Sequence, residues 1–225
     1  MTDSKSGKQI DPRRLEAEIQ ASYDAQLGDG ALANRLGWRL LYSPERVLEG
    51  ARVAFLGFNP GGSHIDPRHG VFASPRGSAY RREIESWGTA SKLQDQALAL
   101  FRRLRVQPED VLAGNLVPLR SPSEAELRNK ERAIGFGIKI WTQILAAVNP
   151  PIVISLGNST NEIVSRLVGA RDVRKVEVGW GTITESRGEF DGGIWIGLPH
   201  LSRFAIMTRR ESAKALDLLF AGTAQ

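Results

Sequence analysis

The sequence contains no cysteine among its 225 residues. This absence excludes a disulfide framework, a zinc site built on thiolates, an iron–sulfur cluster and a thiol nucleophile. The sequence also has no apolar run of the length that spans a bilayer, and its first residues, MTDSKSGKQ, lack the hydrophobic stretch of a signal peptide. We therefore expect a soluble, intracellular (cytoplasmic) protein without a membrane partner, whose chemistry depends on oxygen and nitrogen groups.

Hydrophobic residues make up 41% of the chain, enough at this length for one core of native density. Residues 1–10 are polar and aperiodic, which predicts a flexible N-terminal tail before a single domain at residues 11–225. Lys and Arg number 30 against 25 Asp and Glu, so the net charge is +5, and the pI is near 9.8. This excess favours an anionic partner such as nucleic acid or nucleotide.

Four short apolar runs predict the strands of a parallel sheet. Continuous apolar runs are typical of strands that are covered on both faces, and helix-period segments follow the first three. The pattern predicts an α/β fold, specifically a three-layer α/β/α sandwich with a short, mainly parallel four-stranded sheet. Residues 173–186 alternate in polarity and predict a hairpin excursion before the last strand. The four runs are residues 53–58, 111–116, 152–156 and 194–198.

Apolar residues at helical spacing predict helices that cover this sheet. Asp11 before Pro12 is an N-cap followed by a first-turn proline. Ser123 and Glu126 have the spacing of a capping box, which predicts a long helix over residues 123–149. Further helices are expected at residues 92–105 and 211–219.

Polar residues follow the predicted strands, at the edge where open parallel sheets bind ligands. Asn59 follows the first strand, Asn115 ends the second, and His200 follows the fourth. Each has an ordinary explanation: a turn residue, a hydrogen-bonded core amide and a structural histidine. The Gly61-Gly62 turn would also serve as a phosphate nest. The three polar side chains together favour a functional site.

In this order, the motifs resemble those of the uracil-DNA glycosylase superfamily over roughly residues 50–205. Gly57-Phe58-Asn59-Pro60-Gly61 is similar to the first motif of the mismatch-specific and single-strand-selective monofunctional branches. Phe72 stands where the superfamily has the aromatic residue that stacks on the extruded base. Asn115 is similar in position to the asparagine that reads uracil, and His200-Leu201-Ser202 resembles the His-Pro-Ser motif.

The chain departs from the family's pattern in its third motif. Leu201 replaces the proline, and Arg203-Phe204 differs from the loop that follows in the best-known members. The absence of cysteine separates the chain from the iron–sulfur branches. The sequence therefore resembles the cluster-free branches, or a divergent branch of its own.

The resemblance implies a monofunctional DNA glycosylase of base excision repair, which hydrolyses the N-glycosidic bond of uracil or a related damaged base. The catalytic residues would be Asn59, whose carbonyl would hold a water, and His200, which would donate to O2 of the departing base. The base-binding residues would be Phe58, Gly61, Phe72 and Asn115, and the DNA-binding residues Arg76, Arg120, Ser202 and Arg203.

The carboxamide of Asn115 suits the reading of uracil after base flipping. It can donate to O4 and accept from N3–H, whereas cytosine presents the opposite pattern at these atoms. Because Gly61 stands where the uracil-restricted branch has a tyrosine that blocks the thymine methyl group, we expect DNA with uracil or a 5-substituted uracil as the partner. A monomer is expected.

No cofactor and no metal are expected. His64 and His69 flank Asp66, but their spacing matches no metal-ligand pattern. Two other functions stay open. A protein of the same fold would bind nucleic acid or a nucleotide without base excision, which the departure at Leu201 favours, and a nucleotide hydrolase would use the Gly61-Gly62 turn as its phosphate nest.

Overall fold

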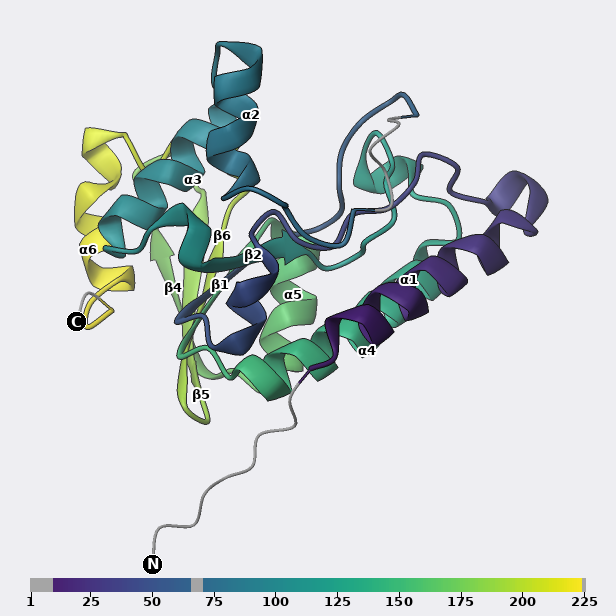
Figure 1. Cartoon of the computed structure of the whole chain (residues 1–225). Helices are drawn as coiled ribbons and strands as arrows, with labels where there is room; N and C mark the ends of the chain where they lie inside the picture. The colour runs from purple at the N-terminus through teal and green to yellow at the C-terminus, as the bar shows by residue number, and fades with distance from the viewer. Residues whose placement is uncertain (1–9, 66–70, 224–225) are drawn as a thin grey trace, which may run out of the picture.

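The computed structural model describes residues 10–65 and 71–223 (Figure 1). It has an α/β fold with one six-stranded mixed sheet, in the order β2-β1-β3-β6-β5-β4. The tail expected at residues 1–10 lies, apart from Ile10, outside the described residues. The strands are β1 (Val53–Gly57), β2 (Val111–Asn115), β3 (Ile152–Leu156), β4 (Arg171–Glu177), β5 (Thr184–Phe190) and β6 (Gly193–Leu198).

The four apolar runs form four neighbouring parallel strands, as predicted. β1 pairs with both β2 and β3, and β3 pairs with β6, all in the parallel sense. Val53, Ala54, Phe55 and Leu56 of β1 are fully buried. This burial explains why the strand reads as a continuous apolar run.

The expectation of four strands is wrong, because the sheet has six and is mixed. The predicted hairpin excursion is β4 and β5, which continue the sheet: β5 pairs antiparallel with β6, and β4 pairs antiparallel with β5. β4 lies at the edge, and nearly all of its residues are exposed. An exposed edge strand carries charged residues rather than an apolar run, so the apolar-run criterion could not find it.

Helices cover both faces of the sheet (Figure 1). Along β1, Ala54 and Leu56 join one apolar cluster while Val53 and Phe55 join the other, as the alternation of strand side chains requires. The first cluster includes residues of α1 (Pro12–Leu27), α4 (Lys130–Val148) and α5 (Asn158–Leu167). The second includes residues of α2 (Ala79–Trp87), α3 (Lys92–Arg103) and α6 (Ala213–Leu219).

The helix predictions are confirmed except at one boundary. The Asp11 carboxylate accepts from the backbone N–H of Arg13 and Arg14, at 3.0 and 3.3 Å, and so caps α1 as predicted. The long helix expected at residues 123–149 begins only at Lys130. The Ser123 hydroxyl instead donates to the Glu126 carboxylate at 2.9 Å, within a short 3₁₀ turn that precedes the helix.

An irregular segment at residues 38–42 lies beside β2. Leu41 pairs with Gly114, and the Tyr42 N–H donates to the Ala113 carbonyl at 2.8 Å. Arg39 and Tyr42 are therefore brought to the end of β2 where Asn115 lies. Within residues 10–65 and 71–223, no helix is long and apolar enough to cross a membrane.

Candidate functional site

The residues that follow β1, β2, β3 and β6 lie along one edge of the sheet, which we call the carboxyl edge. Because these four strands are parallel neighbours, their carboxyl ends meet there. Asn59 follows β1, Asn115 ends β2, and His200 follows β6. The structure therefore places the three predicted polar residues on the same edge.

The side-chain amide of Asn59 is held by the segment that follows β2. Its Nδ2 donates to the Ser121 hydroxyl at 2.9 Å and to the Pro60 carbonyl at 3.1 Å. The same Ser121 hydroxyl donates its own proton to the Ser123 carbonyl at 2.6 Å. Since that proton is already committed, the hydroxyl can only accept from Asn59. The amide nitrogen must face Ser121, and Oδ1 faces away from these acceptors.

Asn115 is 7% exposed and packs directly over the backbone of β1. A Cβ atom at Gly57 would lie only 2.6 Å from Asn115 Oδ1. The first glycine of the motif is therefore required by the close approach of this amide. The backbone carbonyl of Asn115 accepts from the indole N–H of Trp141 at 2.7 Å, which fixes the end of β2.

His200 has a defined tautomer in its neutral form. The backbone N–H of Ser202 donates to His200 Nδ1 at 3.4 Å, and the Ser202 hydroxyl lies 2.7 Å from the same nitrogen. A backbone N–H can only donate, so Nδ1 is an acceptor and the ring proton is on Nε2. Partial burial and the positive charge of Arg203 lower the pKa of His200, against the opposing charge of Glu124. The neutral ring thus presents an N–H donor near pH 7.

Glu124 lies near His200, and Lys130 lies near Phe58, which precedes Asn59. The sequence did not indicate either Glu124 or Lys130. Lys130 Nζ lies 2.6 Å from Glu124 Oε1 and 5.5 Å from the centre of the Phe58 ring. Partial burial raises the pKa of Glu124, but hydrogen bonds from Lys130 and Ser159 outweigh it, so that the pKa is lowered. Because the sequence predicted one helix over residues 123–149, the turn that contains Glu124 was missed. The Ser123-Glu126 spacing was the only sequence signal of this turn.

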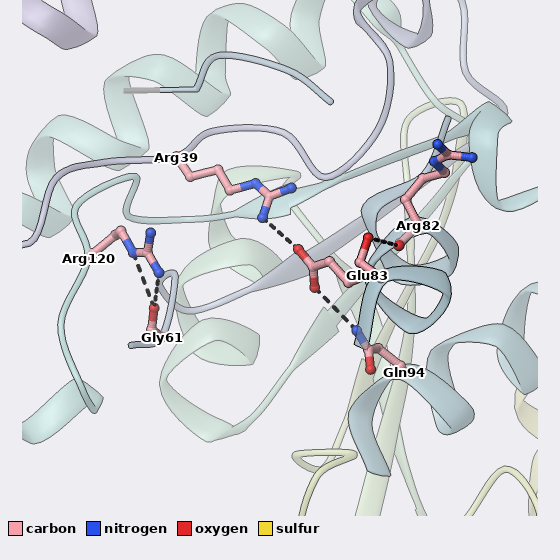
Figure 2. Close-up of polar contacts among 7 residues, drawn as sticks. Arg39, Gly61, Arg82, Glu83, Gln94 and Arg120 are labelled. Carbon is pink, nitrogen blue, oxygen red and sulfur yellow. Dashed lines mark hydrogen bonds and ion pairs between the residues drawn. The ribbon is translucent and has the colours of Figure 1, made fainter. Parts of the chain in front are cut away.

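Sequence reasoning also missed a second group, Tyr42, Arg39 and Glu83, of which Figure 2 shows Arg39 and Glu83. The Tyr42 hydroxyl interacts with the side chain of Asn115, and burial raises the pKa of Tyr42, which keeps it protonated at neutral pH. The guanidinium of Arg39 lies 4.1 Å above the Tyr42 ring. Arg39 Nη1 also pairs with Glu83 Oε1 at 2.9 Å. These residues come from an irregular segment and α2, for which no motif or apolar run gave a signal.

Of the other predicted base-binding residues, Phe58 and Phe72 are buried, whereas Gly61 is exposed. Phe58 and Phe72 are 8% and 5% exposed, and both pack in the apolar cluster on the α1 and α4 face. Gly61 is exposed, and a Cβ atom there would have no neighbour within 4 Å. The stacking role of Phe72 stays a prediction, and so does the acceptance of 5-substituted uracils that Gly61 predicts.

Of the predicted DNA-binding residues, Arg120, Ser202 and Arg203 lie along the carboxyl edge. Arg76 does not, because its neighbour Gly77 packs against Glu109, which precedes the opposite end of β2. Arg76 and Arg203 are exposed, and Ser202 is half-buried against the His200 ring. Arg120 donates from Nε and Nη2 to the Gly61 carbonyl, at 3.3 and 3.1 Å. Arg203 and Arg120 thus lie beside the two catalytic candidates, at opposite parts of the edge.

Leu201 is fully buried in the cluster on the α2 and α3 face. An apolar side chain fits this position because its neighbours are core residues. The departure from proline at this position therefore has a packing explanation.

The possible metal ligands named above and the residues that line two cavities do not include Asn59, Asn115 or His200. Of the histidine group considered as metal ligands, Asp66 and His69 fall outside the described residues. The two cavities have volumes of about 220 and 480 Å³. The first is lined by α4 and Phe190, and the second by α3 and Thr208.

The sequence matches no model of a known protein family, and no curated protein matches it. The resemblance to uracil-DNA glycosylases therefore depends on the motif residues alone.

Proposed function

We propose that this chain hydrolyses the N-glycosidic bond of uracil, or of a related damaged base, in DNA. The observation that carries the proposal is the fixed orientation of the Asn59 amide by Ser121. It leaves a carbonyl acceptor on the same edge as the Nε2–H donor of His200. An acceptor for a water and a donor for a leaving anion are the two groups that this hydrolysis needs.

In the proposed reaction the bond between C1′ and the base nitrogen breaks, and its electron pair leaves with the base. The sugar becomes cationic, and a water held by Asn59 Oδ1 attacks C1′ while its surplus proton passes to solvent. His200 Nε2–H donates to O2 of the departing anion, as an oxyanion-hole donor does. The lowered pKa of His200 keeps this role available to a neutral ring.

Asn115 would read the base from the end of β2. Its burial gives the amide a fixed place, and Tyr42 contacts its side chain. A base with the wrong donor and acceptor pattern would leave buried polar groups unpaired, which makes such a site discriminating. The partner would be DNA, and the acting species a monomer.

Substitution of Asn59 tests the proposal most simply. Asn59→Ala should lower the single-turnover excision rate by about 10²-fold or more, with affinity for uracil-containing DNA nearly unchanged, because Asn59 holds the water and not the base. Ser121→Ala should give a smaller loss, since it frees the amide to rotate. Asn158→Ala, an exposed asparagine on the same edge, serves as the matched control and should excise at the parental rate.

Excision at the parental rate by Asn59→Ala would make Asn59 a turn residue and contradict the proposed reaction. Cleavage of free nucleotides with no cleavage of oligonucleotides would instead favour the nucleotide-hydrolase alternative. Binding of oligonucleotides with no excision at all would favour the non-catalytic alternative.

A further inference from the structure

A chain of polar side chains joins α5 to the end of β6, just before His200. The indole N–H of Trp195 donates to the Ser155 hydroxyl at 2.9 Å, and this hydroxyl lies 2.7 Å from Asn161 Oδ1. Asn161 Nδ2 in turn donates to the backbone carbonyl of Leu198 at 3.0 Å. Trp195, Ser155 and Leu198 are at most 3% exposed. None of these side chains has a part in the proposed bond cleavage.

The chemistry of these groups fixes the direction of every hydrogen bond in the chain. An indole N–H can only donate, so Ser155 Oγ accepts from Trp195 and gives its own proton to Asn161 Oδ1. The amide oxygen of Asn161 therefore faces Ser155, and the amide nitrogen faces the Leu198 carbonyl. A flipped amide would bring its oxygen against that carbonyl, where both groups are acceptors. The orientation of the Asn161 amide is thus determined by its neighbours.

The Leu198 carbonyl is held by two donors. The backbone N–H of Gly157, which follows β3, donates to this carbonyl at 2.9 Å, and the Gly157 carbonyl accepts from the Asn161 N–H at 2.8 Å. The turn between β3 and α5 is therefore bonded to the end of β6. Pro199, whose ring restricts φ, is the single residue between Leu198 and His200. The position of the Leu198 carbonyl thus constrains where the His200 backbone lies.

The His200 ring lies against the same turn. A Cβ atom at Gly157, which has φ +84°, would lie 3.7 Å from His200 Cδ2. The backbone carbonyl of His200 accepts from the N–H groups of Arg203 and Phe204, at 2.9 and 3.1 Å. Ser202 contacts Nδ1 of the ring. The ring is therefore placed by its own loop and by the turn that Asn161 helps to hold.

We propose that Asn161 is a positioning residue for His200, with its amide oriented by the Ser155 hydroxyl. By holding the Leu198 carbonyl, it fixes the place from which His200 Nε2–H donates. A catalytic donor has to be held within about 0.5 Å of its productive position, and a buried chain of hydrogen bonds supplies that rigidity. The catalytic role of His200 rests on the proposed function, whereas its placement by Asn161 does not.

A second buried serine separates positioning from a purely structural role. If the chain of hydrogen bonds only paired buried polar groups, its loss would lower stability and leave the His200 ring unchanged. Ser43 is fully buried like Ser155, and its hydroxyl donates to the Val111 carbonyl where β2 begins, at the end of the sheet opposite to His200. Ser43→Ala and Ser155→Ala therefore delete the same group, but only Ser155→Ala disturbs the chain that ends at Leu198.

The test follows the imidazole nitrogens by NMR in the full chain with isotope-labelled histidine, and His200→Gln assigns the signals of His200 among the three histidines. In the parent, the neutral ring should carry its proton on Nε2. In Asn161→Ala and Ser155→Ala the loop loosens, so both nitrogens should share the proton. The pKa of His200 should rise toward its ordinary value of 6.5, because the ring becomes more solvated. Ser43→Ala should keep the parental tautomer and pKa.

Single-turnover excision of uracil supplies the second readout. Asn161→Ala should excise about tenfold more slowly than the parent while its affinity for the oligonucleotide stays within about twofold, because the donor is displaced and the DNA contacts remain. If Asn161→Ala does not fold, Ser155→Ala, which deletes one hydroxyl, gives the same two readouts.

The parental tautomer and pKa of His200 in the folded variants, or an equal change in Ser43→Ala, would overturn the proposal. Parental excision by folded Asn161→Ala would overturn it as well. Because the NMR measurement requires no excision, a parent whose His200 ring responds as described but that excises no uracil would refute only the proposed function.

Discussion

Gly61 is exposed and has open space where a side chain would lie. No atom would lie within 4 Å of a Cβ added there, and its backbone is outside the left-handed region. A side chain at this position would therefore be accommodated without backbone strain, and its bulk would reach into unoccupied space. In the proposed function, the size of the residue at this position would affect which bases are accepted.

We predict that the parent excises 5-hydroxymethyluracil as well as uracil, and that Gly61→Tyr suppresses the substituted base more than uracil, by about tenfold or more in relative kcat/KM. Competition between the two bases in matched oligonucleotides measures the ratio. Gly135→Tyr, at an exposed position with similar space on α4, should leave it unchanged. A parent that cuts uracil and leaves every 5-substituted uracil intact would refute the inference.

The contact between Gly57 and Asn115 yields a second prediction at the residue scale. In Gly57→Ala the new methyl would meet Asn115 Oδ1 at 2.6 Å, and the buried amide has little room to move. We expect a loss of about 1–3 kcal/mol in unfolding free energy and a fall in uracil excision that exceeds the effect of the lost stability. Denaturant unfolding and single-turnover rates measure the two effects, with Gly135→Ala as the control. Parental excision would show that Asn115 is not held where the base is read.

At the scale of elements, the sequence predicted the strands that are buried on both faces and failed to assign the more exposed strands to the sheet. β1, β2, β3 and β6 were predicted because strands covered on both faces read as apolar runs. β4 and β5 were not assigned to the sheet. β4 is an exposed edge strand that carries charged residues, and β5, although it lies between β6 and β4, has polar residues among its buried ones instead of an apolar run. The start of α4 was misplaced because Ser123 and Glu126 satisfy one another in a turn.

The same distinction applies to the candidate site. Asn59, Asn115 and His200 follow predicted strands, so sheet topology alone brought them to one edge. Arg39, which reaches the edge from the segment beside β2, could not be found in this way. Its contacts with Tyr42 and Glu83 depend on tertiary packing between segments far apart in the chain.

β5 contains a buried carboxyl group whose titration is expected to govern the pH dependence of stability. Glu185 is 1% exposed, and within the described residues neither of its carboxylate oxygens has a hydrogen-bond partner. Burial raises the pKa of Glu185 to about 8 from an ordinary value of 4.5, although Arg103 opposes the shift. The folded protein then holds a proton that the unfolded chain releases, so stability falls as the pH rises between these two values.

We predict that Glu185→Gln removes this fall and stabilises the protein above pH 8 by on the order of a few kcal/mol, at about 1.4 kcal/mol per unit of pKa shift. Near pH 4.5 the variant and the parent should be equally stable. Denaturant midpoints across this range, with Glu189→Gln on the same strand as an exposed control, measure the effect. A parent whose stability does not decline between these pH values would contradict the assignment.

At the scale of the whole molecule, the net charge and the side-chain composition bear on the proposed partner and the proposed reaction. The net charge of +5 favours association with a polyanion. Within residues 10–65 and 71–223, no group of three or more His, Asp or Glu side chains is placed to hold a metal ion. In the proposed reaction His200 stabilises the leaving anion.

We therefore predict that excision persists after exhaustive chelation. Treatment with EDTA should leave the single-turnover rate within about twofold of the untreated value, because Asn59 and His200 supply the groups that the reaction needs. Loss of activity that a divalent ion restores would require a different mechanism.

Uracil excision is measured by incubating the protein with matched single- and double-stranded oligonucleotides that contain one uracil or one cytosine. Alkali then cuts the strand at any abasic site. We predict cleavage at uracil by the parent and no cleavage at the matched cytosine position, because Asn115 would reject the donor and acceptor pattern of cytosine. The Asn59→Ala/His200→Ala double variant should lose at least about 10³-fold in excision rate, since water positioning and anion stabilisation are both removed. No cleavage at uracil by the folded parent, or equal cleavage by the folded double variant, would contradict the proposed function.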